Sequence, residues 1–526
     1  MADSIYTNFI EAKNGTLIPE LKSGRTLESR YNPQRDGENL ANSLDKKFSF
    51  FLLMGIGSGI LISKILEKFP ESRILALEMT DAELSFLKTN QETAKILSDK
   101  RIILSTSDQL EKNLINYYIP AKFGDLKIIE QKNWLLENED KLDFIKSQIK
   151  NALEIISSDF SVQSHFGKIW TCNILNNIKL LSKQNADYSL KAKEKLAAGK
   201  NIIGKNKKAL VLGAGPSLDQ KIEILKKNPE NYFIISTDTA FQTLSKHKIK
   251  PDMVFSLDGQ AISHNHFINS SDFSDILFAF DLSANFSAVK HVLDAGGKII
   301  FFISGHPLSV LFNQFYKHYA NALPELNSGS GTVTIAALDF AVKCGFKNIQ
   351  VLGADFGYSR GKAYTRGTYL DVLYNKGANR LKTSEKLFDN LLFRTELEKV
   401  SDDKVTTKIL SGYKTSFEDF LEKNHLNYKL EDEIYQIENP KNHENPKNTV
   451  AKDFIENIFK NHNFDYQNFN YQNFKDFFMQ TEKKEPEVFE IALLPYISWL
   501  RKNADYKDLK FQDFQNLAKS FIVSYN

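Results

Sequence analysis

Short apolar runs alternate with longer amphipathic stretches along most of the chain. The clearest runs lie at 208–212, 232–237, 252–257 and 348–353, and each ends in small or polar residues. Runs of this length between turn residues indicate buried strands, and the stretches between them have helical spacing. Strands that alternate with helices in this way predict a Rossmann-like, doubly wound parallel α/β sheet. In such a sheet, ligands bind beyond the carboxyl ends of the strands.

The turn after the first of these strands has the sequence GAGPSLD, from Gly213 to Asp219. Gly213 and Gly215 allow a tight turn and a close approach of the backbone to a ligand. Pro216 suits the first position of a helix, and Ser217 is a capping residue. Because free N–H groups at a helix start bind anions, the turn predicts a phosphate site. A tight turn without a ligand is the alternative.

Acidic residues follow three of the predicted strands. Asp238, with Thr239 beside it, follows the second strand, Asp258 follows the third, and Asp355 follows the strand at 348–353. In a doubly wound sheet these carboxylates face one crevice. There they would hold a divalent cation such as Mg²⁺, orient sugar hydroxyls or supply a base. Since Asp and Gly favour turns, an Asx turn is the alternative for Asp258.

A second helix start, before the predicted helix at 333–343, is also rich in small polar residues. It contains Ser328, Ser330, Gly331 and Thr332, and it predicts a second anion site. An ordinary Gly-rich loop with a Ser/Thr cap is the alternative.

Histidines and a glycine-punctuated segment complete the candidate site. His306 follows the predicted strand at 298–303, where an imidazole would meet a phosphate or a sugar carboxylate. His264 and His266 are interpreted as surface residues of a loop. The segment 356–367 is polar and aromatic, as expected of a mobile lid.

The ordered motifs of the central segment carry a resemblance to a known family. GAGPSLD, STDTA, IKPDMVFSLD and SGSGTVTIAALDFAVKCGFKNIQVLGADF resemble the central domain of the motility-associated factor (Maf) glycosyltransferases. That domain, of the DUF115 or MptE-like type, is also similar to the bacterial sialyltransferases and to an archaeal 6-hydroxymethylpterin diphosphokinase group. The resemblance is closest over residues 200–420.

The resemblance implies a glycosyltransferase for flagellin. A nonulosonic acid, of pseudaminic or legionaminic type, would move from a CMP-activated donor to Ser/Thr hydroxyls of flagellin, the protein partner. Gly213, Gly215, Pro216 and Ser217 would meet the nucleotide or its phosphate beside Asp238 and Thr239, and Ser328, Ser330, Gly331 and Thr332 would meet the carboxylate or phosphate.

The candidate base departs from the sialyltransferase pattern. Those enzymes use a histidine downstream of the lid, but this chain has no histidine between Asp355 and His425. The candidate bases are therefore Asp355 first, then Asp258 and Tyr364. Ala214 stands where sialyltransferases tend to carry an asparagine that contacts the nucleotide.

Two other functions stay open. A pterin diphosphokinase using ATP and magnesium would use the carboxylates as metal ligands. A non-catalytic binding protein of the flagellar or surface-glycan system is the other alternative. We expect no tightly bound cofactor and leave Mg²⁺ open.

An earlier glycine turn predicts a second Rossmann-like domain. The apolar run at 48–54 is followed by GIGSG, a helix at 60–69 and a strand at 73–77 that ends at Glu78. Glycines with a following acid suit a nucleotide, and the pattern resembles the core of an S-adenosylmethionine-dependent methyltransferase. A structural or protein-binding Rossmann-like domain is the preferred interpretation. Short runs at 101–105 and 127–129 would extend its sheet.

These patterns predict four parts. They are an amino-terminal Rossmann-like domain at 1–130, a helical connector at 131–200, the central domain at 201–425 and a helical carboxy-terminal domain at 426–526. Residues 425–449 are predicted to be loops or a linker. The formal net charge of +3 gives no indication of a nucleic-acid partner, and no run is long enough for a membrane span. Two cysteines form no disulfide framework. A cytoplasmic protein is expected.

Overall fold

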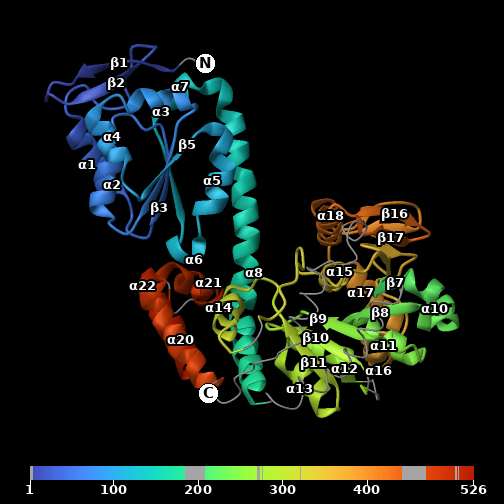
Figure 1. The fold of residues 1–526 in the computed structure, drawn as a ribbon. Helices are drawn as coiled ribbons and strands as arrows, with labels where there is room; N and C mark the ends of the chain where they lie inside the picture. The colour runs from blue at the N-terminus through green and yellow to red at the C-terminus, as the bar shows by residue number, and fades with distance from the viewer. Residues whose placement is uncertain are drawn as a thin grey trace. The chain divides into compact units, whose positions relative to one another are not determined.

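The computed structural model describes residues 4–183, 208–268, 273–274, 276–319, 322–440, 469–503, 506 and 509–525. The chain divides into two compact units. Unit 1 comprises Met1–Lys168 and Leu494–Phe521, and unit 2 comprises Ile169–Leu493 and Ile522–Asn526 (Figure 1). The division into four parts stays a prediction. Residues 184–200 of the predicted connector lie outside the described residues.

Unit 1 is built on a parallel sheet with the strand order β5-β4-β3-β6. Every residue of β3 (Phe50–Met54) is buried, because helices cover both faces of the sheet. The predicted short strands are confirmed as β5 (Ile102–Ser105) and β6 (Leu126–Glu130). The other elements up to α8 are β1 (Tyr6–Glu11), β2 (Leu17–Leu21), α1 (Pro33–Ser43), α2 (Ile60–Lys68), β4 (Arg73–Leu77), α3 (Asp81–Leu87), α4 (Gln91–Leu97), α5 (Leu110–Tyr117), α6 (Pro120–Phe123) and α7 (Lys132–Glu137).

The glycine turn of unit 1 is filled by a side chain of the chain itself. Glu28 Oε1 accepts a hydrogen bond from the backbone N–H of Ser58 at 2.5 Å. A Cβ added at Gly57 would lie only 2.2 Å from the same oxygen. The carboxylate therefore occupies the place that a ligand phosphate takes in a nucleotide-binding turn.

Glu78, the acid predicted for a ribose hydroxyl, is also held by the protein itself. Its carboxylate accepts hydrogen bonds from the Tyr6 hydroxyl, the Ile56 N–H and the Trp134 indole N–H, each at 2.7 Å. The residue is fully buried. Both features favour the structural interpretation of this domain over the methyltransferase interpretation.

Unit 2 is built on a larger sheet with the strand order β11-β10-β9-β8-β7-β12-β17-β16. The strands from β11 (Lys298–Phe302) to β12 (Asn348–Leu352) are parallel, which confirms the predicted fold class. The chain leaves β7 (Lys208–Leu212) on one side through β8 (Tyr232–Thr237) and returns to its other side at β12. The reversal makes the gap between β7 and β12 the topological switch point.

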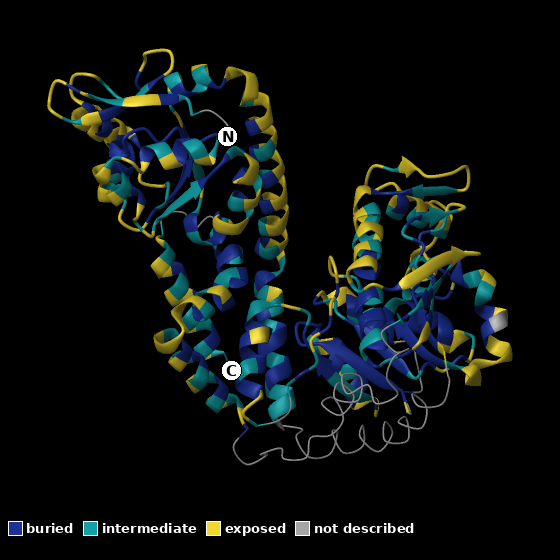
Figure 2. Cartoon of the chain, turned by 45° about the horizontal axis from the view of Figure 1, so that its top comes forward, coloured by how far each residue is buried: buried dark blue, intermediate teal, exposed yellow. Residues whose placement is uncertain are grey.

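Helices cover most of this sheet, as the dark blue strands in Figure 2 show. α15 (Val333–Lys343) and α18 (Lys408–Lys423) share one core with the strands, and α10 (Leu218–Lys227) and α11 (Asp238–Lys246) share the other. The other elements are β9 (Met253–Ser256), α12 (Asn265–Ile268), β10 (Leu277–Asp281), α13 (Phe286–Asp294), α14 (Pro307–Tyr316), β13 (Tyr358–Ser359), α16 (Tyr369–Gly377), α17 (Ser384–Leu392), β14 (Glu398–Lys399), β15 (Lys404–Thr406), α20 (Tyr471–Lys484), α21 (Pro486–Lys502) and α22 (Phe511–Ser524).

The structure corrects one sequence-based prediction about this sheet. Residues 425–449 were expected to be loops or a linker, but β16 (Asn427–Glu431) and β17 (Ile434–Glu438) form an antiparallel hairpin that extends the sheet, while residues 441–449 lie outside the described residues. β17 pairs with β12 because Tyr435 and Ile437 are buried in the core beneath it. All five residues of β16 are exposed, although Tyr428 and Leu430 alternate with polar residues along it.

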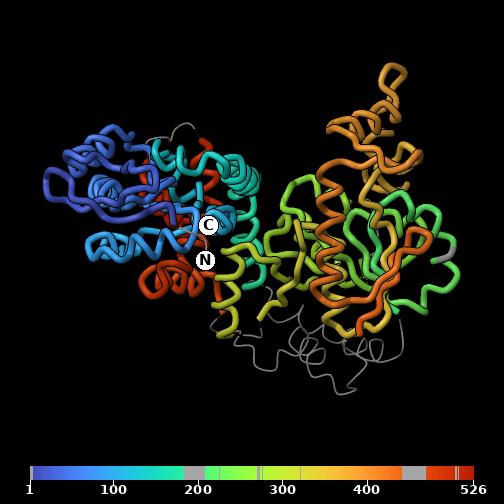
Figure 3. Tube along the Cα trace, turned by 90° about the horizontal axis from the view of Figure 1, so that it is seen from above, coloured from blue at the N-terminus to red at the C-terminus, as the bar shows by residue number. Residues whose placement is uncertain are grey.

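The long helix α8 (Leu142–Lys183) contributes its last residues to unit 2. It runs vertically in Figure 1 and is seen nearly end-on in Figure 3. The Asn173 amide donates to the carbonyls of Gly259 and Ser283, and the Asn177 amide donates to those of Leu282 and Ala284. α8 therefore covers the loops beyond the carboxyl ends of β9 and β10. No helix in the described ranges has the length and apolar character needed to cross a membrane.

Glu78 makes the stability of the protein depend on pH. Burial raises its pKa from 4.5 to about 8, although its hydrogen bonds lower it. A raised pKa contributes stability that is present below the unfolded value and lost as pH rises through about 8. Glu78→Gln removes this titration. We expect the advantage in Tm of the wild type over Glu78→Gln to shrink from about pH 5 to about pH 9 in thermal denaturation. A constant difference would contradict this.

Candidate functional site

The turns after β7 and β12 cross at the switch point in direct backbone contact. The N–H of Gly213 donates to the carbonyl of Leu352, and that of Gly215 donates to the carbonyl of Gly353, both at 2.8 Å. A Cβ added at Gly213 would lie 2.5 Å from the Gly353 carbonyl oxygen. These glycines therefore allow a close backbone crossing, which the sequence pattern alone does not predict.

Asp355 occupies the predicted phosphate position of the first turn. Its Oδ2 accepts a hydrogen bond from the Ser217 N–H at 2.8 Å, and a Cβ added at Gly215 would lie 2.2 Å from that oxygen. The side chain is buried and caps the start of α10. The N–H group assigned to a phosphate is thus bound to a carboxylate, and Asp355 is committed to this bond.

The segment predicted to be a mobile lid is fixed to the same turn. The Asp219 carboxylate accepts hydrogen bonds from the Thr365 hydroxyl, the Arg366 N–H and the Lys362 ammonium group. Although partial burial raises the pKa of Asp219, these bonds hold it below its usual value. The Thr365 N–H donates to the Ala214 carbonyl at 2.9 Å.

Asp238 and Asp258 lie close enough to interact beyond the ends of β8 and β9. Asp238 is buried, and its carboxylate accepts hydrogen bonds from the Ser256 hydroxyl and the Thr239 N–H, both at 2.7 Å. Burial, followed by the charge of Asp238, raises the pKa of Asp258, although a hydrogen bond from the Gln260 N–H lowers it. A carboxylate with a raised pKa is suited to accept a proton.

Tyr364 of the lid segment interacts electrostatically with Asp238, and Tyr369 at the start of α16 interacts with both acids. Burial of its hydroxyl raises the pKa of Tyr364, and the charge of Asp238 adds to the effect. Burial raises the pKa of Tyr369 to about 12, with smaller contributions from Tyr364 and the two acids. Both phenols therefore stay protonated near neutral pH and act as hydrogen-bond donors, which weakens the prediction of Tyr364 as a base.

His266 is a member of this group that sequence reasoning missed. It was interpreted as a surface residue, but it is 8% exposed, and its ring stands edge-on to that of Tyr369 at 4.8 Å. His266 is buried because α12 packs against α16. No pattern in the sequence around His266 predicts this packing.

His306 has a different role from the one predicted. Its Nδ1 accepts a hydrogen bond from the Leu308 N–H at 3.2 Å, and its ring stands edge-on to Trp170. Burial lowers the pKa of His306 to about 3, so the imidazole is neutral at physiological pH. It therefore caps α14 and supplies no positive charge to a phosphate or carboxylate, which corrects the prediction.

The predicted second anion loop is a capped turn before α15. The carbonyl of Ser328 accepts hydrogen bonds from the N–H groups of Gly331 and Thr332, and the Thr332 hydroxyl accepts from the Ile335 N–H. The Ser330 hydroxyl lies 2.5 Å from that of Ser416. Anion binding here stays a prediction.

The three strand-end acids do not form one group. Among the described residues, no group of three or more His, Cys, Asp or Glu side chains is placed to hold a metal ion. Asp238 and Asp258 form one pair, whereas Asp355 caps α10. The shared cation site considered from sequence is therefore not assembled by these three side chains.

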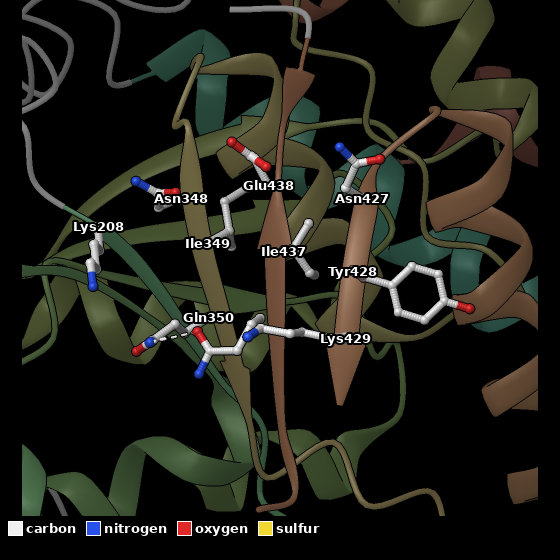
Figure 4. Close-up of a pocket in the computed structure, with 10 residues that line it drawn as sticks. Lys208, Asn348, Ile349, Gln350, Asn427, Tyr428, Lys429, Ile437 and Glu438 are labelled. Atoms are coloured by element: carbon white, nitrogen blue, oxygen red, sulfur yellow. Dashed lines mark hydrogen bonds between the residues drawn. The ribbon is translucent and has the colours of Figure 1, made fainter. Parts of the chain in front are cut away.

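Two cavities of unit 2 lie away from the acidic pair. A cavity of about 450 Å³ is lined mainly by polar residues of β12, β17 and β16, where Gln350 and Gln436 are hydrogen-bonded (Figure 4). It includes Lys208 and Asn348, the first residues of β7 and β12, so it lies at the edge opposite the ligand edge. A smaller cavity of about 190 Å³ adjoins Asp355.

Comparison with known proteins identifies the central domain. A family profile described as "6-hydroxymethylpterin diphosphokinase MptE-like" matches residues 172–361. The match includes the end of α8 that is bonded to unit 2. The MptE-like (DUF115) type expected from sequence is thereby confirmed for this domain.

Three uncharacterised proteins of Treponema pallidum (strain Nichols) are similar to the chain. One is 36% identical over 28% of this chain and 51% of the relative, so the chain spans about half of that protein. A second is 32% identical over 31% of this chain and 72% of the relative. A third is 30% identical over 69% of this chain and 61% of the relative. The chain belongs to the family of these Treponema proteins, with a central domain of the MptE-like type.

One solved structure also resembles the chain. It is the structure of a Maf glycosyltransferase from Magnetospirillum magneticum AMB-1, at 12% identity and a TM-score of 0.46, covering 99% of this chain and 90% of that one.

The crossing at the switch point predicts a cost for any side chain at Gly215. Gly215→Ala would place its Cβ against Asp355 and the Gly353 carbonyl, 2.2 and 2.7 Å away. We expect a loss of roughly 1–3 kcal/mol in the free energy of unfolding, measured by denaturant titration. Gly412→Ala is the matched control, because nothing lies within 4 Å of its Cβ and it lies inside α18. Equal stability of the two variants would contradict the crossing.

Proposed function

We propose that this protein is a glycosyltransferase. It transfers a nonulosonic acid, of pseudaminic or legionaminic type, from a CMP-activated donor to Ser/Thr hydroxyls of flagellin. The observation that carries the proposal is the pair Asp238 and Asp258 beyond the ends of β8 and β9, at the ligand edge, where Asp238 also interacts electrostatically with Tyr364. The motif resemblance and the MptE-like profile support a nucleotide-linked substrate at this edge.

Each side chain of the pair has a distinct part in the proposal. Asp258 accepts the proton of the acceptor hydroxyl, because its raised pKa brings it toward the working pH. Asp238 is held by Ser256 and Thr239 and orients hydroxyl groups of the donor. Tyr364 donates a hydrogen bond to the departing phosphate, whose charge grows in the transition state.

Asp355, the first candidate for the base, is a positioning residue in this proposal. Its hydrogen bond to the Ser217 N–H fixes the start of α10 and the turn that carries Gly213 and Gly215. Ser328, Ser330 and Thr332 are proposed to meet the donor carboxylate at the start of α15. This helix packs against β7, β8 and β9.

A pterin diphosphokinase is the second candidate, and the description of the matching family profile favours it. Such an enzyme would use ATP and magnesium. The carboxylates of the described chain do not converge in a group of three, so the nucleotide phosphates would have to supply further ligands to the ion.

Nucleotide binding tests the donor class. We expect CMP to raise the Tm of the protein more than ATP with magnesium, because a ligand that binds only the folded state stabilises it. The measurement is a thermal shift at matched nucleotide concentrations. A larger shift with ATP and magnesium would favour the diphosphokinase.

Turnover tests the base. Asp258→Asn is expected to lower hydrolysis or transfer of the CMP-sugar roughly a hundredfold, the usual scale for a lost proton acceptor, and to keep the CMP shift. Asp355→Asn is the matched control, since an amide oxygen still accepts from the Ser217 N–H. If Asp355→Asn has the larger loss, Asp355 is the base and the assignment of Asp258 is wrong.

A further inference from the structure

Several polar side chains of unit 2 are buried with one atom that makes no hydrogen bond within the described chain, and three of them belong to elements that contact one another. The atoms of these three are Gln242 Oε1, His266 Nδ1 and Thr368 Oγ1. The three residues are 2%, 8% and 1% exposed. Buried polar atoms in folded proteins almost always have a partner, so these three, called the orphan cluster below, require an explanation.

The cluster is assembled from three separate elements that contact one another. The Gln242 amide of α11 donates to the Asn265 carbonyl, directly before His266, at 2.6 Å. The Thr243 hydroxyl donates to the Arg366 carbonyl at 2.9 Å, which fixes the same helix to the segment before Thr368. The three residues therefore belong to elements that meet one another, α11, α12 and the start of α16.

The cluster continues the proposed donor site away from the phosphate. Asp238 and Gln242 lie four residues apart on α11 and so share one face of the helix. Asp258 interacts electrostatically with both Asp238 and His266. In doubly wound domains, the acid at the end of the second strand binds the ribose, and the base lies beyond it.

The chemistry of the cluster fits a neutral, flat group that donates hydrogen bonds. Asp238 and Asp258 next to it disfavour a phosphate. Because the Gln242 nitrogen already donates to the Asn265 carbonyl, its Oε1 is left as an acceptor. The rings of His266 and Tyr369 supply the flat surfaces on which an aromatic base packs.

We propose that Gln242, His266 and Thr368 form the nucleobase pocket of the donor. Gln242 Oε1 accepts a hydrogen bond from the exocyclic amino group of the base, which selects cytosine or adenine over uracil. Uracil presents a carbonyl oxygen at that position, and two acceptors repel each other. This assignment rests on the proposed function, because it presumes a nucleotide at this edge.

The first test separates a ligand contact from a structural role. Thr368→Val removes the orphan hydroxyl at constant shape. Without nucleotide, we expect an unchanged or higher Tm, because an unsatisfied buried group is lost. In the same variant, CMP affinity measured by calorimetry should fall roughly tenfold. Ser309→Ala on α14 is the matched control, since Ser309 is also a buried orphan but outside the cluster. Its CMP affinity should not change.

The second test measures base selectivity with Gln242→Met. Wild-type protein should bind CMP at least tenfold more tightly than UMP, and the variant should lose most of this difference. If CMP binds the wild type but neither Thr368→Val nor Gln242→Met changes affinity or selectivity, the pocket is wrong and the proposed function stands. If no nucleotide binds or stabilises the wild type, the proposed function fails and the pocket fails with it.

Discussion

The close crossing of the turns after β7 and β12 is the constraint on which the rest of unit 2 depends. Two backbone hydrogen bonds at 2.8 Å join turns that are distant in sequence. The two backbones lie so close that a side chain at Gly213 or Gly215 would have no room. The crossing places Asp355 against the Ser217 N–H and thereby fixes α10. The lid segment is bonded to the same turn, because the Thr365 N–H donates to the Ala214 carbonyl and the Thr365 hydroxyl donates to the Asp219 carboxylate.

In both units, a carboxylate of the chain binds an N–H group of the glycine turn. A glycine turn before a helix leaves N–H groups that need a negatively charged or polar acceptor. In unit 1 the acceptor for Ser58 is Glu28, and in unit 2 the acceptor for Ser217 is Asp355. A glycine turn in a sequence therefore indicates that its free N–H groups need a hydrogen-bond acceptor. In both units this acceptor is a carboxylate of the chain itself.

Sequence patterns predicted the strands well, because β7, β8, β9 and β12 are apolar runs with clear turn residues. β10 has the same apolar character but was not predicted, and the alternation of Tyr428 and Leu430 with polar residues in β16 was not recognised as a strand. The site was predicted only in part. Asp238 and Asp258 were found from their place after strands. The bond between Asp355 and Ser217 spans 138 residues, and no local pattern reports such a contact. The burial of His266 likewise depends on tertiary packing.

The exposed strand β16 has a consequence for the solubility of the protein. Among the described strands it ends the sheet, so one row of its backbone N–H and carbonyl groups has no neighbouring strand. Such an edge is a template for pairing between molecules. The strand counters this by being short and by carrying Lys429, whose ammonium group pairs with Glu431 at 2.8 Å. A second sheet that approached this edge would have to desolvate both charges, which disfavours edge-to-edge aggregation.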